Sequence, residues 1–435
     1  VIQSDSINFK SVEKGVREGI AELFWGRTRQ DGSKGLVWEW AKGRPSCTPM
    51  TGGDDAAEDS QLINYVQYCK LKLKDKEERK VAIQSFKYVQ EPDAKAEFEK
   101  VLEVTLRKMQ LSPEVRFTRE AEEVGLKGST LVMFPTVFKL VAALQRSRRT
   151  FAILFRSFGA DHETVKMEWN AFCEMKHPVY SKLIQGIGPM DGTRPGVPDR
   201  RIKTWHTLYR DAEGPMLILD NFTNGPEERP WDSWAKEKPA AKEDTRGGRQ
   251  YAHEVLSAKT VEGIPGLAEW MLAHIMAQGT SVIKDDWAWW QYHGEQADAG
   301  KLLTVVGGEG EVKQLFFDDN IDQDDARIVD CRDVDGNCIP AERSLNKLCV
   351  KVNPVEAMLD DEYFLRKLQL CHGEHLEMGY NLVDFQRQLT EVEDQRAELQ
   401  EQVKKFQGQM RNLTEENRRM KLLRRITVRD EAQLR

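Results

Sequence analysis

Hydrophobic residues recur at helical spacing near the beginning of the chain. Val12, Val16, Ile20 and Leu23 lie three or four positions apart, which predicts an amphipathic helix that ends near Gly26. The sequence that starts at this glycine, GRTRQDGSKG, combines basic residues with three glycines, and it is expected to form a loop.

A long charged region follows. Residues 61–119 are dense in Lys and Glu and are interrupted at Pro92 and Pro113. This pattern predicts several helices, each with a charged face in contact with solvent. With the first helix, they are expected to form an N-terminal helical, cap-like region over residues 1–130.

The pattern changes at residue 131, where short apolar runs begin to alternate with helical segments. The runs Phe151–Phe155 and Leu315–Phe317 are too short for helices and apolar enough for buried strands. A helix is predicted after Pro135, and a hairpin is predicted with its turn at residues 211–214. Strands that alternate with helices favour an α/β domain over residues 131–350, with a mostly parallel sheet covered on both faces.

The C-terminal region carries a heptad pattern. Hydrophobic residues alternate at spacings of three and four from Leu382 to Met420, and only Arg396 and Asn417 are polar along this seam. The pattern predicts a coiled coil over residues 360–425, and a buried Asn favours a parallel pair of identical chains. The alternative is a long helix that folds back on its own domain.

Composition narrows the class of protein. The chain has 435 residues, is 40% hydrophobic and 31% charged, and carries a formal net charge of −7. An acidic chain argues against general binding to nucleic acid or to an acidic membrane surface, and no apolar run approaches the length of a membrane span. Seven scattered cysteines favour reduced thiols in a cytosolic or nuclear setting, and a cytoplasmic location is expected. The absence of a CxxC pair argues against a structural zinc site.

Candidate chemistry lies at the ends of the two buried strands. Asp318 and Asp319, called the acidic pair below, follow one strand directly, and Ser157 ends the other. Two carboxylates with substrate oxygens and water suit Mg²⁺. Lys301 lies shortly before the acidic pair, and an ammonium group and a hydroxyl beside a bound metal ion are suited to holding a phosphate group.

These residues resemble the motifs of the haloacid dehalogenase-like (HAD) hydrolase superfamily over roughly residues 131–330. The resemblance implies that Ser157 is the hydroxyl of the second motif and that the acidic pair is the Mg²⁺-binding fourth motif. Lys301 would be the lysine of the third motif, with Lys284 as the rival candidate. The implied function is Mg²⁺-dependent phosphoryl transfer or hydrolysis on a phosphorylated small molecule.

The nucleophile motif of that superfamily, DxDx[TV], is absent from the sequence. Residues 1–6, VIQSDS, resemble the loop that follows this motif, so the first strand and its aspartate are expected to precede residue 1. The chain as given is therefore expected to show no turnover. The competing hypothesis is a non-catalytic interaction or scaffold protein that acts through its C-terminal coiled coil.

Overall fold

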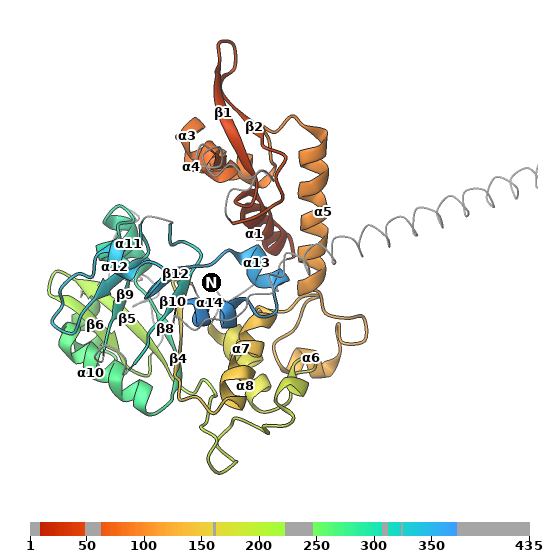
Figure 1. Cartoon of the computed structure of the whole chain (residues 1–435). Coiled ribbons are helices and arrows are strands. Elements are labelled where there is room, and N and C mark those ends of the chain that lie inside the picture. Colours follow the sequence, from red (N-terminus) through yellow and green to blue (C-terminus); the bar gives the residue numbers. More distant parts are fainter. Residues whose placement is uncertain are drawn as a thin grey trace, which may run out of the picture. The chain divides into compact units, whose positions relative to one another are not determined.

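The structure of the chain is a computed structural model, and Figure 1 shows its course. The residues that the structure describes are 9–47, 62–159, 162–221, 247–306, 312–322 and 325–371. Contacts divide the chain into two compact units, residues 1–378 and 379–435, and every described residue belongs to the first. The predicted heptad seam, which starts at Leu382, lies outside the described residues.

The N-terminal part begins with a helix and a small sheet. Helix α1 (Phe9–Ala21) is followed by β1 (Trp25–Asp31) and β2 (Gly35–Trp40), which pair as an antiparallel hairpin. The expectation of a loop at GRTRQDGSKG is therefore wrong, because these residues form most of β1 and the turn into β2. A two-residue strand, β3 (Ile63–Asn64), pairs with the other edge of β1.

Helices follow this sheet, as the charged region predicts. They are α3 (Tyr65–Lys72), α4 (Lys76–Gln84), α5 (Pro92–Met109) and α6 (Arg119–Glu123). Their starts have clear local causes. Asn64 and Gln67 form a capping box at α3, Asp75 accepts from the backbone N–H of Glu78 at α4, and Pro92 opens α5. Aromatic rings from the hairpin and the helices pack together, with Phe86 stacked on Phe98.

The main sheet has five strands in the order β4-β8-β5-β6-β7. The strands are β4 (Ile153–Ser157), β5 (Trp205–Asp211), β6 (Gly214–Ile218), β7 (Thr260–Glu262) and β8 (Thr280–Lys284). Strands β4, β8 and β5 are parallel, whereas β5, β6 and β7 are antiparallel to their neighbours. The sheet is mixed rather than mostly parallel, because the predicted hairpin turn at Asp211–Gly214 reverses the chain direction within it.

Helices pack against this sheet from two sides. Phe155 of β4 contacts Trp169 of α8 (His162–Cys173), and α10 (Gly263–Met276) packs against β6 and β7. Ile283 of β8 lies in the apolar cluster that includes Leu267 of α10. Since Phe155 is opposite Val282, and adjacent strand residues point to opposite faces, Phe155 and Ile283 project from opposite faces of the sheet.

Four shorter strands form two further parallel pairs. Strand β9 (Lys301–Thr304) pairs with β11 (Val329–Arg332), and β10 (Phe316–Asp318) pairs with β12 (Cys349–Lys351). Arginines from the main sheet bind backbone carbonyls along β9. Arg156 donates to Leu302 at 2.9 Å, and Arg210 donates to Gly300 at 2.7 Å. These bonds connect β9 to the main sheet through side chains.

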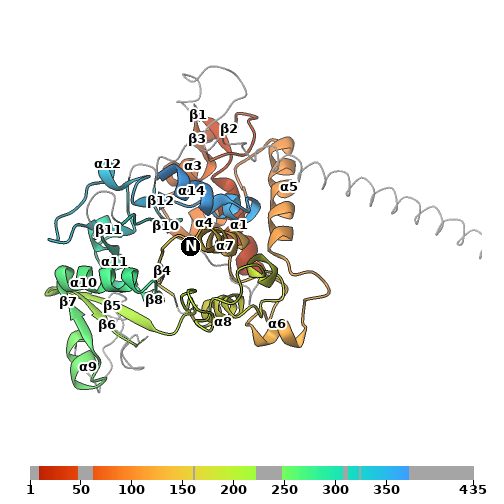
Figure 2. The same cartoon turned by 60° about the horizontal axis from the view of Figure 1, so that its bottom comes forward.

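The described ranges contain further α-helices, most of which are labelled in Figure 2. They are α7 (Pro135–Arg146), α9 (Gly248–Glu254), α11 (Trp287–Tyr292), α12 (Ala341–Ser344), α13 (Pro354–Leu359) and α14 (Tyr363–Cys371). Helix α13 packs against α1 and α5, and α14 packs against α7. The C-terminal end of the described chain therefore contacts helices that come far earlier in the sequence.

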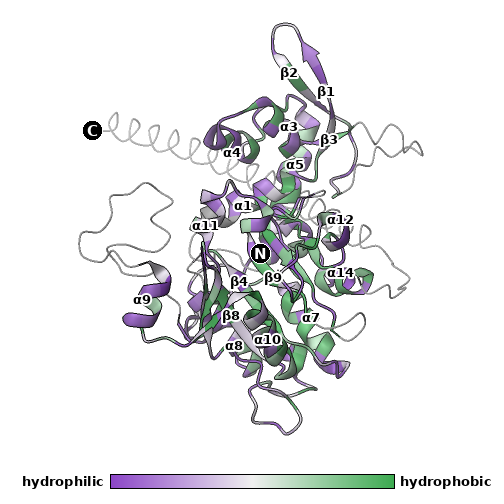
Figure 3. Cartoon of the chain, turned by 90° about the vertical axis from the view of Figure 1, so that its left-hand side faces the viewer, coloured by the Kyte–Doolittle hydropathy of each residue, from purple (hydrophilic) through white to green (hydrophobic). Residues whose placement is uncertain are grey.

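The hydropathy of each element agrees with its place in the fold. Figure 3 shows that α7 is largely hydrophobic and β1 largely hydrophilic. Most residues of α7 are buried, whereas β1 is exposed over Arg27–Gln30. Among the described helices, none has both the length and the apolar character required to cross a membrane.

Candidate functional site

Asp318 is held at the end of β10 by an ion pair. Its side chain is only 2% exposed, and its Oδ2 atom lies 2.8 Å from Nζ of Lys301. The backbone N–H of Asn320 donates to the other carboxylate oxygen at 2.9 Å. Burial by itself raises the pKa of Asp318, but the attraction of Lys301 outweighs it and lowers the pKa below its usual range. The carboxylate is therefore ionised, as a metal ligand must be.

Lys301 connects the acidic pair to the end of β4. It is the first residue of β9, and its Nζ atom lies 4.8 Å from the ring centre of Phe158, the residue after Ser157. The structure thus brings three of the predicted segments into one neighbourhood, although each comes from a different strand.

Ser157 itself has local partners. Its hydroxyl oxygen accepts a hydrogen bond from the backbone N–H of Gly159 at 2.9 Å, and its carbonyl accepts from Asp285 at 2.8 Å. Neither bond joins Ser157 to the acidic pair. The ends of three strands therefore bring the predicted residues into one region. The four predicted side chains do not all contact one another directly.

Asp319 lies in the turn after β10 and is half-buried. Its carboxylate accepts from the side chain of Asn320 at 3.1 Å. Burial raises the pKa of Glu22, at the end of α1, and the charge of Asp319 adds to that rise. An acidic side chain of the N-terminal part therefore approaches the acidic pair, a proximity that the sequence analysis did not identify.

Basic residues accompany these carboxylates. Lys351 of β12 lies 3.7 Å from Glu22 and 3.9 Å from Asp322, and Lys70 of α3 lies 3.7 Å from Asp322. Within the described ranges, no group of three or more His, Cys, Asp or Glu side chains is arranged to hold a metal ion. Mg²⁺ needs only one or two protein carboxylates when substrate and water complete its shell, so Mg²⁺ binding by Asp318 and Asp319 stays a prediction.

Two buried ion pairs lie beside the strand ends and were missed by the sequence analysis. Arg156 binds both carboxylate oxygens of Asp285, and Arg210 binds Asp330 at 2.5 Å. The partners are more than 100 positions apart in the chain. No local pattern could have paired them. Their charges compensate one another, so we interpret them as structural supports for β4, β5 and the segments that follow β8.

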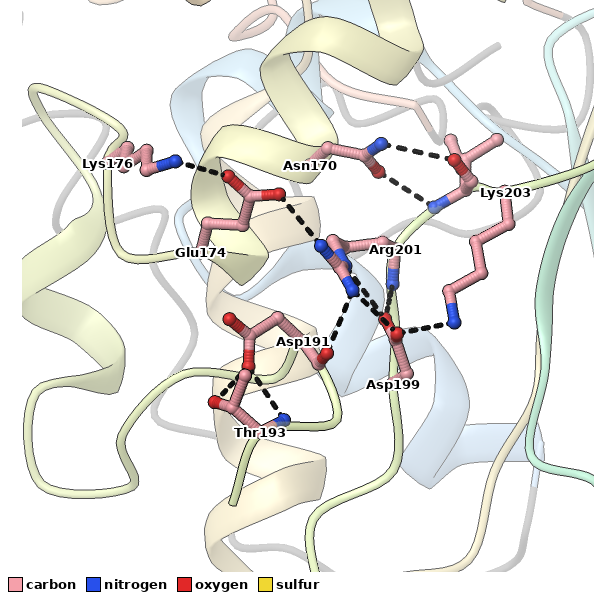
Figure 4. Close-up of polar contacts among 9 residues, drawn as sticks. Asn170, Glu174, Lys176, Asp191, Thr193, Asp199, Arg201 and Lys203 are labelled. Atoms are coloured by element: carbon pink, nitrogen blue, oxygen red, sulfur yellow. Dashed lines mark hydrogen bonds and ion pairs between the residues drawn. The ribbon is translucent and has the colours of Figure 1, made fainter.

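A second polar cluster surrounds Arg201 (Figure 4). Its guanidinium group binds Asp199 at 2.9 Å and Glu174 at 3.1 Å, and it also donates to the carbonyl of Asp191. Lys203 binds Asp199 as well, at 2.6 Å. Asp199 and Glu174 each bind a cation of this cluster, and the carboxylate of Asp191 accepts from the hydroxyl of Thr193. These contacts attach the loop before β5 to the end of α8.

Comparisons of the chain with protein-family models, curated proteins and solved structures gave no match. The interpretation of the site therefore depends on its residues and their geometry. The feature with the clearest chemical meaning is the buried pair of Lys301 and Asp318 beside the end of β4.

Proposed function

We propose that residues 131–350 form a HAD-like α/β domain that binds Mg²⁺ and a phosphate group, with helices on both faces of its sheet and the N-terminal region as a cap. The observation that carries this proposal is the ion pair between Lys301 and Asp318, 2.8 Å long and buried at the end of β10. It supplies an ionised carboxylate and a neighbouring ammonium group close to Phe158.

In this proposal, Asp318 and Asp319 hold Mg²⁺ through their carboxylates. A bound Mg²⁺ ion would draw negative charge from the phosphate oxygens. Ser157 orients the phosphate through its hydroxyl group, and Lys301 keeps Asp318 ionised and adds positive charge. The sequence contains no DxDx[TV] motif, so we expect the chain to bind Mg²⁺ and phosphate without turnover.

Calorimetric titration of the full chain with MgCl₂ tests the metal site. We expect the wild-type chain to bind Mg²⁺, and Asp319→Asn to weaken the binding at least about tenfold, because one of the two charged ligands is lost. Asp335→Asn, which changes an exposed aspartate in another loop, is the matched control and should bind as the wild type does. Equal affinities for Asp319→Asn and the wild type would contradict the proposal.

The second candidate function is that of an interaction protein. The heptad seam from Leu382 to Met420 favours it, since only two seam positions are polar over more than five heptads. In this case a parallel homodimer, or a pair with another heptad-bearing chain, would be the working form. Phosphate binding by the α/β domain would then be dispensable.

Sedimentation equilibrium on residues 365–435 tests this second function. We expect a dimer at tens of micromolar, and we expect Asn417→Leu to be less selective for the two-stranded state. A monomer throughout that range would rule out self-association through the seam.

A further inference from the structure

Two buried thiols, one from β11 and one from β12, contact each other. Cys331 lies within β11 and is 3% exposed, and Cys349 begins β12 and is fully buried. Both are free cysteines, and both belong to one cluster of buried apolar side chains. The thiol of Cys331 is hydrogen-bonded to the thiol of Cys349. The two sulfur atoms are therefore neighbours, although residues 332–348 separate them in the sequence.

The two cysteines come from different pairs of strands. Cys331 of β11 lies opposite Leu303 of β9, and Cys349 of β12 lies opposite Phe316 of β10. In the described part of the chain, these pairs form separate two-stranded sheets. Strands β9 and β10 also carry the lysine and the aspartate of the candidate site. A bond between the two sulfur atoms would therefore link the two sheets that carry this ion pair.

The surroundings of the pair determine which oxidant can react with it. The contact with Cys349 and the burial of the thiol both raise the pKa of Cys331 above its usual range. Since the thiolate is the reactive form of cysteine, we expect slow oxidation. An apolar cluster also excludes charged reagents, because they would lose their hydration on entering it. Hydrogen peroxide is small and neutral, so it is the class of oxidant that suits this pair.

Cys338 provides a comparison within the same segment. It is exposed, and it forms an antiparallel β-bridge with Arg332, the residue after Cys331. Residues that are opposite each other in a bridge project from the same face, whereas consecutive residues of a strand project from opposite faces. The side chain of Cys338 therefore lies on the face of Arg332, away from the side chain of Cys331.

We infer that Cys331 and Cys349 are a redox modification site, in which hydrogen peroxide forms a disulfide that joins the β9–β11 pair to the β10–β12 pair. One thiolate attacks a peroxide oxygen and the O–O bond breaks, which gives a sulfenic acid, while the released hydroxide takes up a proton and becomes water. The second thiol attacks the sulfenic sulfur, and its proton leaves with the sulfenic hydroxyl as another water molecule. Two thiols are oxidised, and one peroxide is reduced to two water molecules.

The test is treatment of the full chain with hydrogen peroxide, for several times longer than the oxidation of Cys338 requires. The remaining thiols are then alkylated with N-ethylmaleimide, and tryptic peptides are analysed by mass spectrometry without a reductant. Trypsin places the three cysteines in separate peptides, which are residues 328–332, 333–343 and 348–351. We expect the first and third peptides to be joined, with the loss of two hydrogens, and dithiothreitol to separate them.

Alanine variants distinguish the buried pair from the exposed thiol. Cys338→Ala is the matched control and should form the crosslink to the same extent as the wild type. Cys331→Ala and Cys349→Ala should form none. Circular dichroism checks that each variant folds. If a buried variant does not fold, the wild type and Cys338→Ala still decide the question, because the peptides identify the bonded cysteines directly.

The thermal transition shows whether the folded state accommodates the bond. A disulfide restricts the unfolded chain, so the oxidised wild type should unfold about 2–6 °C higher than the reduced protein. Dithiothreitol should abolish this difference. A crosslink that leaves the transition unchanged, or lowers it, would contradict a bond between the strand pairs of the folded protein.

Two results of the peptide analysis would also overturn the inference. In the first, Cys338 is oxidised while Cys331 and Cys349 stay alkylated or form only sulfinic and sulfonic acids. In the second, either buried cysteine is bonded to Cys338 in place of its buried neighbour. Neither measurement involves Mg²⁺ or phosphate, so the inference can fail while the proposed function stands, and the reverse also holds.

Discussion

The carboxylate of Asp318 depends on Lys301 for its charged state. Burial raises the pKa of Asp318, whereas the ion pair with Lys301 lowers it below its usual range. A depressed pKa in the folded state contributes stability above the unfolded pKa, near 3.9, and this contribution is lost as the pH falls below that value. We expect the free energy of unfolding, measured in urea, to fall between about pH 5 and pH 3.

Lys301→Met should reverse this behaviour. Removing the ammonium group leaves a buried carboxylate without its partner and should cost about 3–5 kcal/mol at pH 7. Burial would then raise the pKa of Asp318, so the variant should become more stable as the pH is lowered from 7 to 4. Lys203→Met, at an exposed ion pair, is the control. The same fall in stability below pH 5 in both variants would contradict the proposed pairing.

The buried side chain of His206 should make the folding stability depend on pH in a second way. It is 4% exposed, and its ring centre lies 5.1 Å from that of Trp270. Its Nδ1 atom accepts a hydrogen bond from the backbone N–H of Asp220. Burial lowers its pKa to about 4, and the neighbouring His274 adds to this shift while Asp220 opposes it. The unfolded chain binds a proton near pH 6.5, so folding stability should be complete above this value and should fall as the pH drops toward 4.

Urea unfolding of the wild type and of His206→Gln measures this effect. The wild-type chain should lose roughly 2–3 kcal/mol more than the variant between pH 7 and pH 4. Parallel curves for the two proteins would show that folding does not lower the pKa of His206. At low pH, the free energies of unfolding of both proteins also include the contribution of Asp318. This contribution cancels when the two proteins are compared.

At the scale of elements, the hairpin of β1 and β2 depends on a glycine. A Cβ atom on Gly26 would lie 2.3 Å from the carbonyl of Glu39 and 2.4 Å from the ring of Trp38. Gly26→Ala should therefore destabilise the fold by about 1–3 kcal/mol. Gly32→Ala, in the turn of the same hairpin, meets no atom within 4 Å and should change stability by no more than about 0.5 kcal/mol. Thermal unfolding of the two variants compares them, and equal transition temperatures would exclude close packing at Gly26.

The same element illustrates a limit of periodicity. The hairpin carries charged residues on its exposed face, and its glycines by themselves predict a loop. Pairing of β1 with both β2 and β3, and burial of Trp38 among Tyr65 and Phe86, stabilise the strands through distant partners. By contrast, the runs that end at Ser157 and Asp318 were recognisable as strands because both are short and apolar.

At the scale of the whole molecule, helices after the last strand stabilise the N-terminal helices. Asn353 caps α13 and donates to the carbonyl of Gly19 in α1, and the backbone N–H of Phe364 donates to Thr136 in α7. We expect a chain that ends at Met378 to keep the thermal transition of the first unit. A chain that ends at Val352 should lose it, because the apolar faces of α1 and α5 would be exposed.

Circular dichroism melts of the two truncated chains measure this difference. A cooperative transition at the same temperature in both would show that α13 and α14 are not required by the first unit. A separate polypeptide of residues 365–435 should show its own unfolding transition. The midpoint temperature of that transition should rise with protein concentration if the seam pairs two chains.

The sequence alone was sufficient to place α7, the hairpin of β5 and β6, and the strand ends at Ser157 and Asp318. In each case the signal was local: helical or strand periodicity, a proline at a helix start, or a short run of apolar residues. Only the tertiary structure paired Lys301 with Asp318 and Arg156 with Asp285, and only strand register placed Lys284 opposite Ser157. Such partners are distant in the chain, and their contacts follow from the order and register of the strands, which local periodicity leaves open.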